Sequence, residues 1–207
     1  MSGFAPWLYL QARLHNWHRV DEGLYRSAQM YGGRTAALLD SHGIRTVINL
    51  RGENPNSNWY LPERSSCESL GITYLDRSLH SRRLPEKQAL ADLLESFQTA
   101  EAPVLIKCSG GADRTGLAAG LYLLQKHGVS AIDAARRQLS VLPYLHLPKR
   151  YQHWIRRLPE FYVTENEGLP LDQWIQERYT TDGFADWLDA RGLDGSWRRR
   201  SETGRGA

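Results

Sequence analysis

Short apolar runs rich in β-branched residues alternate along this chain with longer segments in which apolar residues recur every three or four positions. The runs at 45–50, 72–76 and 103–107 are typical of buried parallel strands. The longer segments predict helices at 35–42, 59–70, 86–99, 117–126 and 131–139. A turn at 21–23 between apolar residues predicts a short hairpin before the first of these helices. The alternation predicts an α/β fold in which a central, mostly parallel sheet is flanked by helices.

Glycine, proline and serine mark the ends of several predicted helices. Gly43 and Gly71 follow two of them in the position of a helix stop. Pro85 precedes another, in the first turn where proline is tolerated. Ser130 lies three residues before Asp133, and this spacing predicts an N-cap for the helix at 131–139.

The pattern changes after Pro143, where short segments are broken by proline and glycine. Aromatic residues are spread through these segments: Trp154, Phe161, Tyr162, Trp174, Tyr179, Phe184, Trp187 and Trp197. We expect them to anchor helices on the core rather than to form a site. The predicted organisation is an N-terminal aromatic extension (1–19), a core domain (20–142), a helical appendage packed on the core (143–197) and a disordered basic tail (198–207).

Composition narrows the range of partners. Hydrophobic residues make up 41% of the 207 residues and charged residues 24%, which is typical of a globular protein. A net charge of +3 and scattered basic residues give no reason to expect a nucleic acid partner. No apolar run is long enough to span a bilayer, although the aromatic extension could make peripheral contact with a membrane surface. Cys67 and Cys108 are the only cysteines, so we expect a reducing, cytoplasmic setting.

The segment from Cys108 to Thr115 carries the most specific chemistry in the sequence. It joins the predicted strand at 103–107 to a predicted helix, so its backbone N–H groups would converge at a helix N-terminus, which attracts anions. The residues that would line this phosphate site are Ser109, Gly110, Gly111, Ala112, Asp113, Arg114 and Thr115. Arg114 supplies a planar fork for two phosphate oxygens, and Cys108 at the floor would be a thiolate nucleophile. Thr115 is placed to bond the sulfur and to help it leave.

This segment resembles the signature loop of the cysteine-dependent protein tyrosine phosphatase superfamily, Cys-x5-Arg followed by Ser or Thr. The resemblance extends to residues 24–29, 47–53 and 84–86, and it covers about 20–139. In these stretches the chain is similar to the compact atypical dual-specificity phosphatases of bacteria and plants. The resemblance implies a protein tyrosine phosphatase-like fold and hydrolysis of a phosphate monoester through a phosphocysteine at Cys108. It implies no metal or other cofactor, and no cluster in the sequence has metal-ligand spacing.

Two positions depart from the family pattern. The residue before the cysteine is usually histidine, and here it is Lys107, whose charge could still favour the thiolate. The general acid is normally a carboxylate on a separate loop, but 78–84 holds no carboxylate and has His80 as its only potential acid. Asp76 at a predicted strand end and Asp113 within the loop are the two candidates. Asp113 resembles the acid of the myotubularin-type lipid phosphatases.

The substrate stays open between a phosphorylated protein, carrying phosphotyrosine, phosphoserine or phosphothreonine, and a phospholipid or small phosphate ester. The loop interior 109–113 has no lysine or arginine and so offers no extra cations for a heavily phosphorylated inositol head group. Arginines that could rim the pocket and attract an anion are Arg51, Arg77, Arg82 and Arg83. A catalytically weak phosphatase-like module that binds phosphorylated partners is the alternative function. Cys67 could form a protective disulfide with Cys108.

Overall fold

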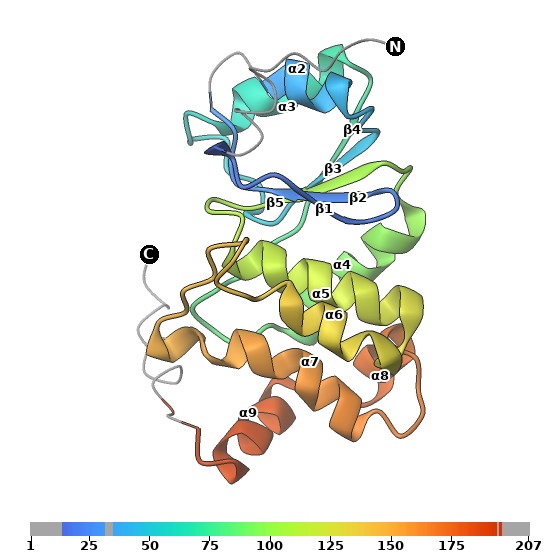
Figure 1. Ribbon diagram of the computed structural model, residues 1–207, viewed down its shortest axis with the longest axis vertical. Helices are drawn as coiled ribbons and strands as arrows, with labels where there is room; N and C mark the ends of the chain where they lie inside the picture. The colour runs from blue at the N-terminus through green and yellow to red at the C-terminus, as the bar shows by residue number, and fades with distance from the viewer. Residues whose placement is uncertain (1–13, 32–34, 194, 196–207) are drawn as a thin grey trace.

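The computed structural model describes residues 14–31, 35–193 and 195 of the chain (Figure 1). The basic tail expected at 198–207 and most of the aromatic extension expected at 1–19 lie outside the described residues. The described part contains a five-stranded sheet in the order β1-β2-β5-β3-β4. Its strands are β1 His18–Asp21, β2 Leu24–Ser27, β3 Thr46–Asn49, β4 Thr73–Asp76 and β5 Val104–Lys107.

Helices connect and cover these strands. In chain order they are α2 Thr35–Ser41, α3 Tyr60–Ser69, α4 Lys87–Thr99, α5 Asp113–His127, α6 Ile132–Arg137, α7 Trp154–Glu165, α8 Leu171–Glu177 and α9 Thr181–Ala190. Two short 3₁₀ turns, η1 Val129–Ala131 and η2 Arg150–Gln152, lie on either side of α6. None of the described helices combines the length and the apolar character needed to cross a bilayer.

The sheet is parallel except at one edge, as the sequence pattern predicts. The hairpin β1–β2 is antiparallel, and β2, β5, β3 and β4 run parallel to one another. All residues of the central strands β3 and β5 are buried, which explains their continuous apolar runs. Asn49 of β3 lies in register with Lys107 of β5 and Asp76 of β4. The side chains of these three residues therefore share one face of the sheet.

The helices form layers on both sides of the sheet (Figure 1). α2 and α3 cover one face, α4, α5 and α6 cover the other, and α7, α8 and α9 pack outside the second group. Because side chains alternate along a strand, neighbouring residues belong to different cores. Val47 and Leu105 pack in the α2–α3 cluster, whereas Ile48 and Ile106 pack in the cluster that extends to α9.

The aromatic residues after 143 pack mainly against one another. Phe161 of α7 is the centre of the group, with ring centroids 5.2 Å from Trp174, 5.0 Å from Phe184 and 5.3 Å from Trp187. These rings belong to the same hydrophobic cluster as the apolar residues of α4 and α5. They are core residues that fasten the last three helices to the rest of the fold, and Trp197 lies outside the described residues.

One local prediction is wrong. The expected N-cap Ser130 does not cap a helix, because its hydroxyl donates to the carbonyl of His127 and lies inside η1. The chain passes through this 3₁₀ turn before α6 begins at Ile132, and no side chain caps that helix. A side-chain cap is present at α9, where the hydroxyl of Thr180 accepts a hydrogen bond from Gly183 N.

Candidate active site

Strand β5 leads directly into a tight loop, residues 108–112, which ends where α5 begins. Cys108 is the first residue of this loop and is 2% exposed. Gly111 has a φ of +64°, and a Cβ at this position would lie 2.5 Å from Ala28 N. Only glycine fits such a backbone conformation this close to another chain segment. The loop therefore lies tightly against the residues that follow β2 as it curls around the N-terminus of α5.

Arg26 of β2 holds the outer side of the loop. Its Nη2 donates to the carbonyls of Gly111 at 2.8 Å and Ala112 at 3.3 Å. Its Nη1 donates to the backbone and side-chain oxygens of Gln138, at 2.7 and 2.9 Å. Burial lowers the pKa of this guanidinium to about 10, which still leaves it positively charged at neutral pH. A buried cation is thus used to fix loop carbonyls in place.

Asn16 holds the same side of the loop from the N-terminal segment. Its Nδ2 lies 3.2 Å from the carbonyls of both Gly110 and Gly111, and 3.0 Å from the carbonyl of Tyr144. The Oδ1 of Asn16 is 2.8 Å from Nε2 of His18. Asn16 has a φ of 51°, a left-handed conformation in which asparagine is enriched. The N-terminal segment therefore contributes directly to the shape of the loop.

These outward contacts determine where the loop N–H groups point. The carbonyl of Ser109 accepts a hydrogen bond from Gln29 N at 3.1 Å, so the carbonyls of 109, 110, 111 and 112 are all engaged by residues outside the loop. In a trans peptide the C=O and the following N–H point in opposite directions. The N–H groups of 110–113 therefore point toward the inner side of the loop, where they can bind an anion.

Arg114 folds back over this concave side. Its Nη2 donates to Ser109 Oγ at 2.9 Å, and its Nη1 lies 3.5 Å from the carbonyl of Leu50. The neighbouring Thr115 is fully buried, and its hydroxyl has no hydrogen-bond partner among the described residues. Cys108 thus begins the loop, and Arg114, just after its end, bonds back to Ser109 beside the cysteine. The predicted bond between Thr115 and the sulfur is not formed.

The two candidate acids are held in different places. Asp113 is the first residue of α5, and its carboxylate accepts from Gln152 Nε2 at 2.8 Å and lies 3.0 Å from His146 Nδ1. Asp76 accepts from Asn49 Nδ2 at 2.7 Å and from the Tyr60 hydroxyl at 2.5 Å. Asp113 directly follows the loop that carries the nucleophile, whereas Asp76 faces α3 on the opposite side of the sheet.

The sequence between 27 and 167 matches the family model described as PTP-SAK, Swiss Army Knife protein, DSP-PTPase phosphatase domain. This chain belongs to the DSP-PTPase family of phosphatase domains. The matched residues include the loop 108–115 and the segment with His146 and Gln152 that contacts Asp113. The family therefore takes in part of the region that the sequence pattern separates as an appendage.

Comparisons with individual proteins agree with the family. The dual specificity protein phosphatase TpbA of Pseudomonas aeruginosa is 29% identical over 115 residues, which are 55% of this chain and 48% of TpbA. The chain thus spans about half the length of that relative. A crystal structure of TpbA with pTyr covers 86% of this chain and 92% of that chain at 22% identity and a TM-score of 0.50. The structure of PTPMT1 covers 72% of this chain and 97% of the PTPMT1 chain, at 17% identity and a TM-score of 0.54. At these identities the two solved structures show a shared fold.

Lys107 occupies the position that usually carries histidine in this DSP-PTPase domain, and it faces away from Cys108. Its Nζ lies 2.6 Å from Glu63 Oε1 and 2.9 Å from Gln29 Oε1, and 4.3 Å from the ring centre of Trp59. Burial lowers the pKa of Lys107, although the adjacent Glu63 opposes this change. The charge of Lys107 is thus paired with Glu63 on the α2–α3 face, and its influence on the Cys108 thiolate stays a prediction.

Two of the four expected rim arginines belong to the scaffold. Arg51 stacks on Trp59 at 3.8 Å and donates to Gln29, and Arg77 donates to Ser96 Oγ at 2.7 Å. Arg82 and Arg83 are exposed on the segment between β4 and α4, which also carries His80. Burial and the nearby guanidinium groups of Arg83 and Arg114 lower the pKa of His80. His80 therefore lies within electrostatic reach of Arg114, and the role of Arg82 and Arg83 at the rim stays a prediction.

Cys67 is not placed to act on Cys108. It is fully buried on α3 in the α2–α3 cluster, whereas Cys108 belongs to the cluster on the other side of the sheet. Burial, together with the nearby Glu63, raises the pKa of the Cys67 thiol to about 12. The suggested protective disulfide would require the two residues to cross the sheet, and the fold does not support it.

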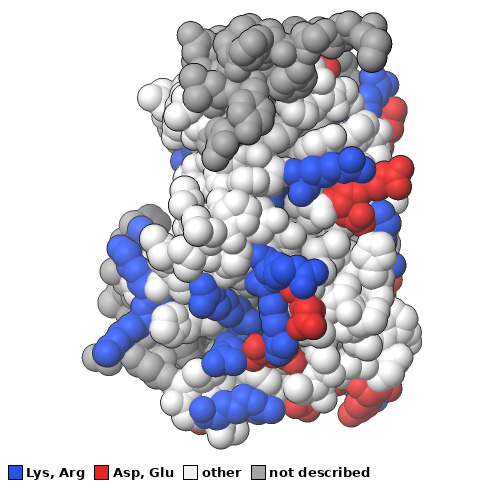
Figure 2. All heavy atoms as spheres, in the orientation of Figure 1, with Lys and Arg blue, Asp and Glu red and all other residues white. Residues whose placement is uncertain are grey.

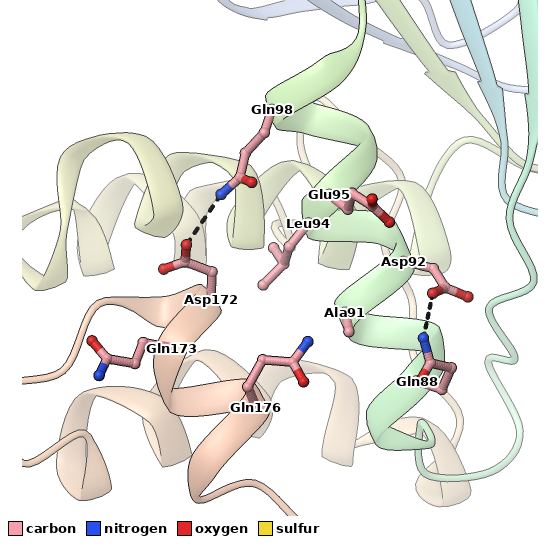
Figure 3. A pocket seen from close by; sticks show the side chains of 9 residues that line it. All are labelled: Gln88, Ala91, Asp92, Leu94, Glu95, Gln98, Asp172, Gln173 and Gln176. Carbon is pink, nitrogen blue, oxygen red and sulfur yellow. Dashed lines mark hydrogen bonds between the residues drawn. The ribbon is translucent and has the colours of Figure 1, made fainter.

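A surface hollow between α4 and α8 lies apart from the signature loop (Figure 3). Its polar side chains bond to one another: Gln98 donates to Asp172 at 3.1 Å, and Gln88 donates to Asp92 at 2.6 Å. The first pair joins α4 to α8, and the second lies within α4. We assign no chemistry to the hollow. No group of three His, Cys, Asp or Glu side chains suited to a metal ion occurs among the described residues.

Proposed function

We propose that this chain hydrolyses phosphate monoesters through a covalent phosphocysteine at Cys108. The single observation that carries the proposal is the signature loop, in which four consecutive carbonyls are held outward so that N–H groups face the concave side beside Cys108. The thiolate of Cys108 attacks phosphorus in line with the leaving oxygen, and the S–P bond forms as the P–O bond breaks. Arg114 and the loop N–H groups stabilise the charge on the equatorial oxygens.

Asp113 is the general acid that we propose for the first step. It lies next to Arg114 in the loop, and 28% of its side chain is exposed, so a leaving oxygen at the mouth of the site can reach it. Gln152 and His146 orient its carboxylate. Asp76 is already fixed by Asn49, Tyr60 and Arg64 on the α3 face and serves the scaffold in this proposal.

Water hydrolyses the phosphocysteine in the second step, and the thiolate leaves. Asp113, now deprotonated, takes the proton from that water. The hydroxyl of Thr115 is the donor that we propose for the departing sulfur, since it is buried next to the loop and uncommitted among the described residues. No metal ion or other cofactor is needed in this sequence of steps.

The substrate we propose carries a single accessible phosphate monoester, on a tyrosine, serine or threonine side chain or on a lipid. The related TpbA is named a dual specificity phosphatase, and one of its structures contains pTyr. The interior of this loop, Ser-Gly-Gly-Ala-Asp, supplies no lysine or arginine for further phosphates. We propose a reducing, cytoplasmic location, because the mechanism needs a reduced Cys108 and both cysteines are free.

The test is hydrolysis of para-nitrophenyl phosphate in EDTA and reductant, with Cys108→Ser beside the matched control Cys67→Ser. We expect turnover in the wild type and in the Cys67 variant, its loss in the Cys108 variant, and inhibition by vanadate. Turnover that survives in Cys108→Ser would overturn the covalent mechanism. A wild type that binds vanadate without turnover would instead indicate the binding module.

A further inference from the structure

The loop that joins α6 to η2 exposes an unusual number of aliphatic side chains. Leu142 is 77% exposed, Leu147 69%, Leu145 59% and Val141 46%. These four residues lie within seven consecutive positions, which we call the aliphatic loop (141–147). Single exposed leucines are common on protein surfaces, but a contiguous group of this kind marks an interaction site.

The aliphatic loop is a fixed structure. Leu145 N donates to the carbonyl of Val141 at 2.7 Å, and His146 N donates to the carbonyl of Ser140 at 3.2 Å. The Ser140 hydroxyl donates to the carbonyl of Leu142 at 2.7 Å. His146, in the middle of the loop, is fully buried beside Asp113. The backbone is thus pinned to the protein while the aliphatic side chains point outward.

Basic residues surround the aliphatic loop. Between positions 134 and 159 the sequence has six Arg or Lys residues and no Asp or Glu. Arg136, Arg137, Lys149, Arg150 and Arg156 are exposed. Figure 2 shows Lys and Arg side chains gathered over the part of this face formed by α6 and α7. Two acidic residues are nearby: Asp133 lies 3.5 Å from Arg136, and Glu160 pairs with Arg136 at 3.3 Å and with Arg157 at 2.7 Å.

The aliphatic loop lies directly beside the signature loop. The carbonyl of Tyr144 accepts from the same Asn16 side chain that holds Gly110 and Gly111. Leu14, two residues before Asn16, is 69% exposed and adds another aliphatic side chain to this side of the molecule. A surface that receives the aliphatic loop would therefore be brought close to the mouth of the candidate active site.

We propose that the aliphatic loop is a membrane-docking element, which inserts its leucines into the interface of an anionic bilayer. Aliphatic side chains presented on a projecting loop can enter the boundary between headgroups and acyl chains, and the surrounding arginines and lysines bind anionic headgroups. A protein partner is less well matched, because the energetic centres of protein interfaces are rich in Trp and Tyr and poor in Leu. The only aromatic residue of the loop, Tyr144, packs its ring against Arg26 at 4.1 Å.

Docking in this orientation would hold the signature loop against the bilayer surface and favour substrates whose phosphate is at that surface. This second statement rests on the proposed function, whereas the docking itself does not. The two can fail separately, because vesicle binding requires no turnover and hydrolysis of para-nitrophenyl phosphate requires no vesicle.

The experiment is co-sedimentation of the full chain with vesicles of phosphatidylcholine alone and with phosphatidylglycerol added. We expect binding to the anionic vesicles that weakens with salt, and a drop of about tenfold or more in partitioning for the double variant Leu142→Glu/Leu147→Glu. The matched control is Leu61→Glu, a 56% exposed leucine on α3, which should bind vesicles like the wild type. All three proteins should hydrolyse para-nitrophenyl phosphate equally, which also shows that they are folded.

Equal partitioning of the double variant and the wild type would overturn the proposal. So would a wild type that fails to bind anionic vesicles. Self-association of the wild type that the double variant abolishes, without vesicle binding, would assign the aliphatic loop to a second copy of the chain instead. A wild type that binds the vesicles but does not hydrolyse para-nitrophenyl phosphate would count against the proposed function and leave the docking in place.

Discussion

Each face of the sheet carries a cysteine and a cation, but the surroundings of these side chains differ between the two faces. On the α2–α3 face, Cys67 is packed in an apolar cluster and Lys107 is paired with the buried Glu63. On the α5 face, Cys108 lies at the start of a loop whose carbonyls are held outward by Arg26 and whose Ser109 side chain is bonded by Arg114. A cysteine and a cation therefore stabilise the fold on one face, whereas on the other face we propose that they take part in the reaction. What separates them is the direction of the backbone amides and the access of an anion.

The largest expected effect concerns the structural cation. Lys107→Met should lower the free energy of unfolding by about 3–5 kcal/mol, because the buried Glu63 carboxylate keeps its hydrogen bonds from Gln29 and Tyr74 but loses its cation. The folded fraction should still turn over substrate, since Lys107 faces away from Cys108. Urea denaturation measures the change. Arg45→Met is the control, because its exposed pair with Glu101 should contribute less than about 1 kcal/mol.

Lys107→Met combined with Glu63→Leu removes both charges and should recover most of the lost stability. A Lys107→Met variant that is stable but inactive would contradict the assignment of this cation to the scaffold.

The next effect separates the two carboxylates. Asp113→Asn should lower kcat at least about 100-fold, because it removes the proton donor to the leaving oxygen. It should also remove the limb of the pH–rate profile that falls as pH rises, since an acid must be protonated to act. Asp76→Asn should keep that limb. Steady-state kinetics across pH checks both, and a falling limb that persists in both variants would exclude the two residues as the titrating acid.

A smaller effect is expected from the residue that shapes the loop from outside. Asn16→Ala removes the bonds to the carbonyls of Gly110 and Gly111, and should weaken vanadate binding about tenfold by freeing those peptides to turn. The control is Asn166→Ala, which loses side-chain hydrogen bonds to the backbone of Val163 and Gly168 but lies at the end of α7. Equal vanadate dissociation constants for the two variants would show that the loop keeps its shape without Asn16.

The smallest expected effect concerns Asp21 at the end of β1, away from the candidate active site. The hydrogen bond from His127, with help from Lys126, lowers the pKa of Asp21 to about 2 from 3.8. The resulting stability is present above about pH 4 and is lost as the pH falls toward 2. Because these groups are partly exposed to solvent, which screens their interaction, Asp21→Asn should cost about 1 kcal/mol or less at neutral pH. Thermal melting from pH 6 to pH 2 should show the wild type and the variant converging; curves that stay parallel would contradict this.

Much of the fold and the centre of the site follow from local sequence patterns. The central strands β3 and β5 are recognisable because parallel strands buried on both sides are continuously apolar. The loop after β5 is recognisable because Cys108, Gly111 and Arg114 lie within seven positions of one another. The strand period could also have placed Lys107, since adjacent residues at the end of β5 must point to opposite faces.

Residues that support the loop from a distance could not be found in this way. Asn16 and Gly111 are 95 positions apart, and Arg26 and Gln138 are 112 apart. The residues that neighbour Asn16 and Arg26 in the sequence do not mark either side chain as a partner of a loop carbonyl. His146 and Gln152 were expected to belong to an appendage, yet they contact Asp113. Their roles depend on which segments the fold brings together, and this information is absent from spacing and composition.

The most direct test of the central claim is acid quench during turnover, followed by peptide mass spectrometry. The account predicts a phosphoryl group on the peptide that contains Cys108, and none on the peptide that contains Cys67. Vanadate should abolish the adduct. A phosphoryl group on a histidine such as His80 or His146, or turnover with no trapped adduct on Cys108 at any quench time, would contradict it.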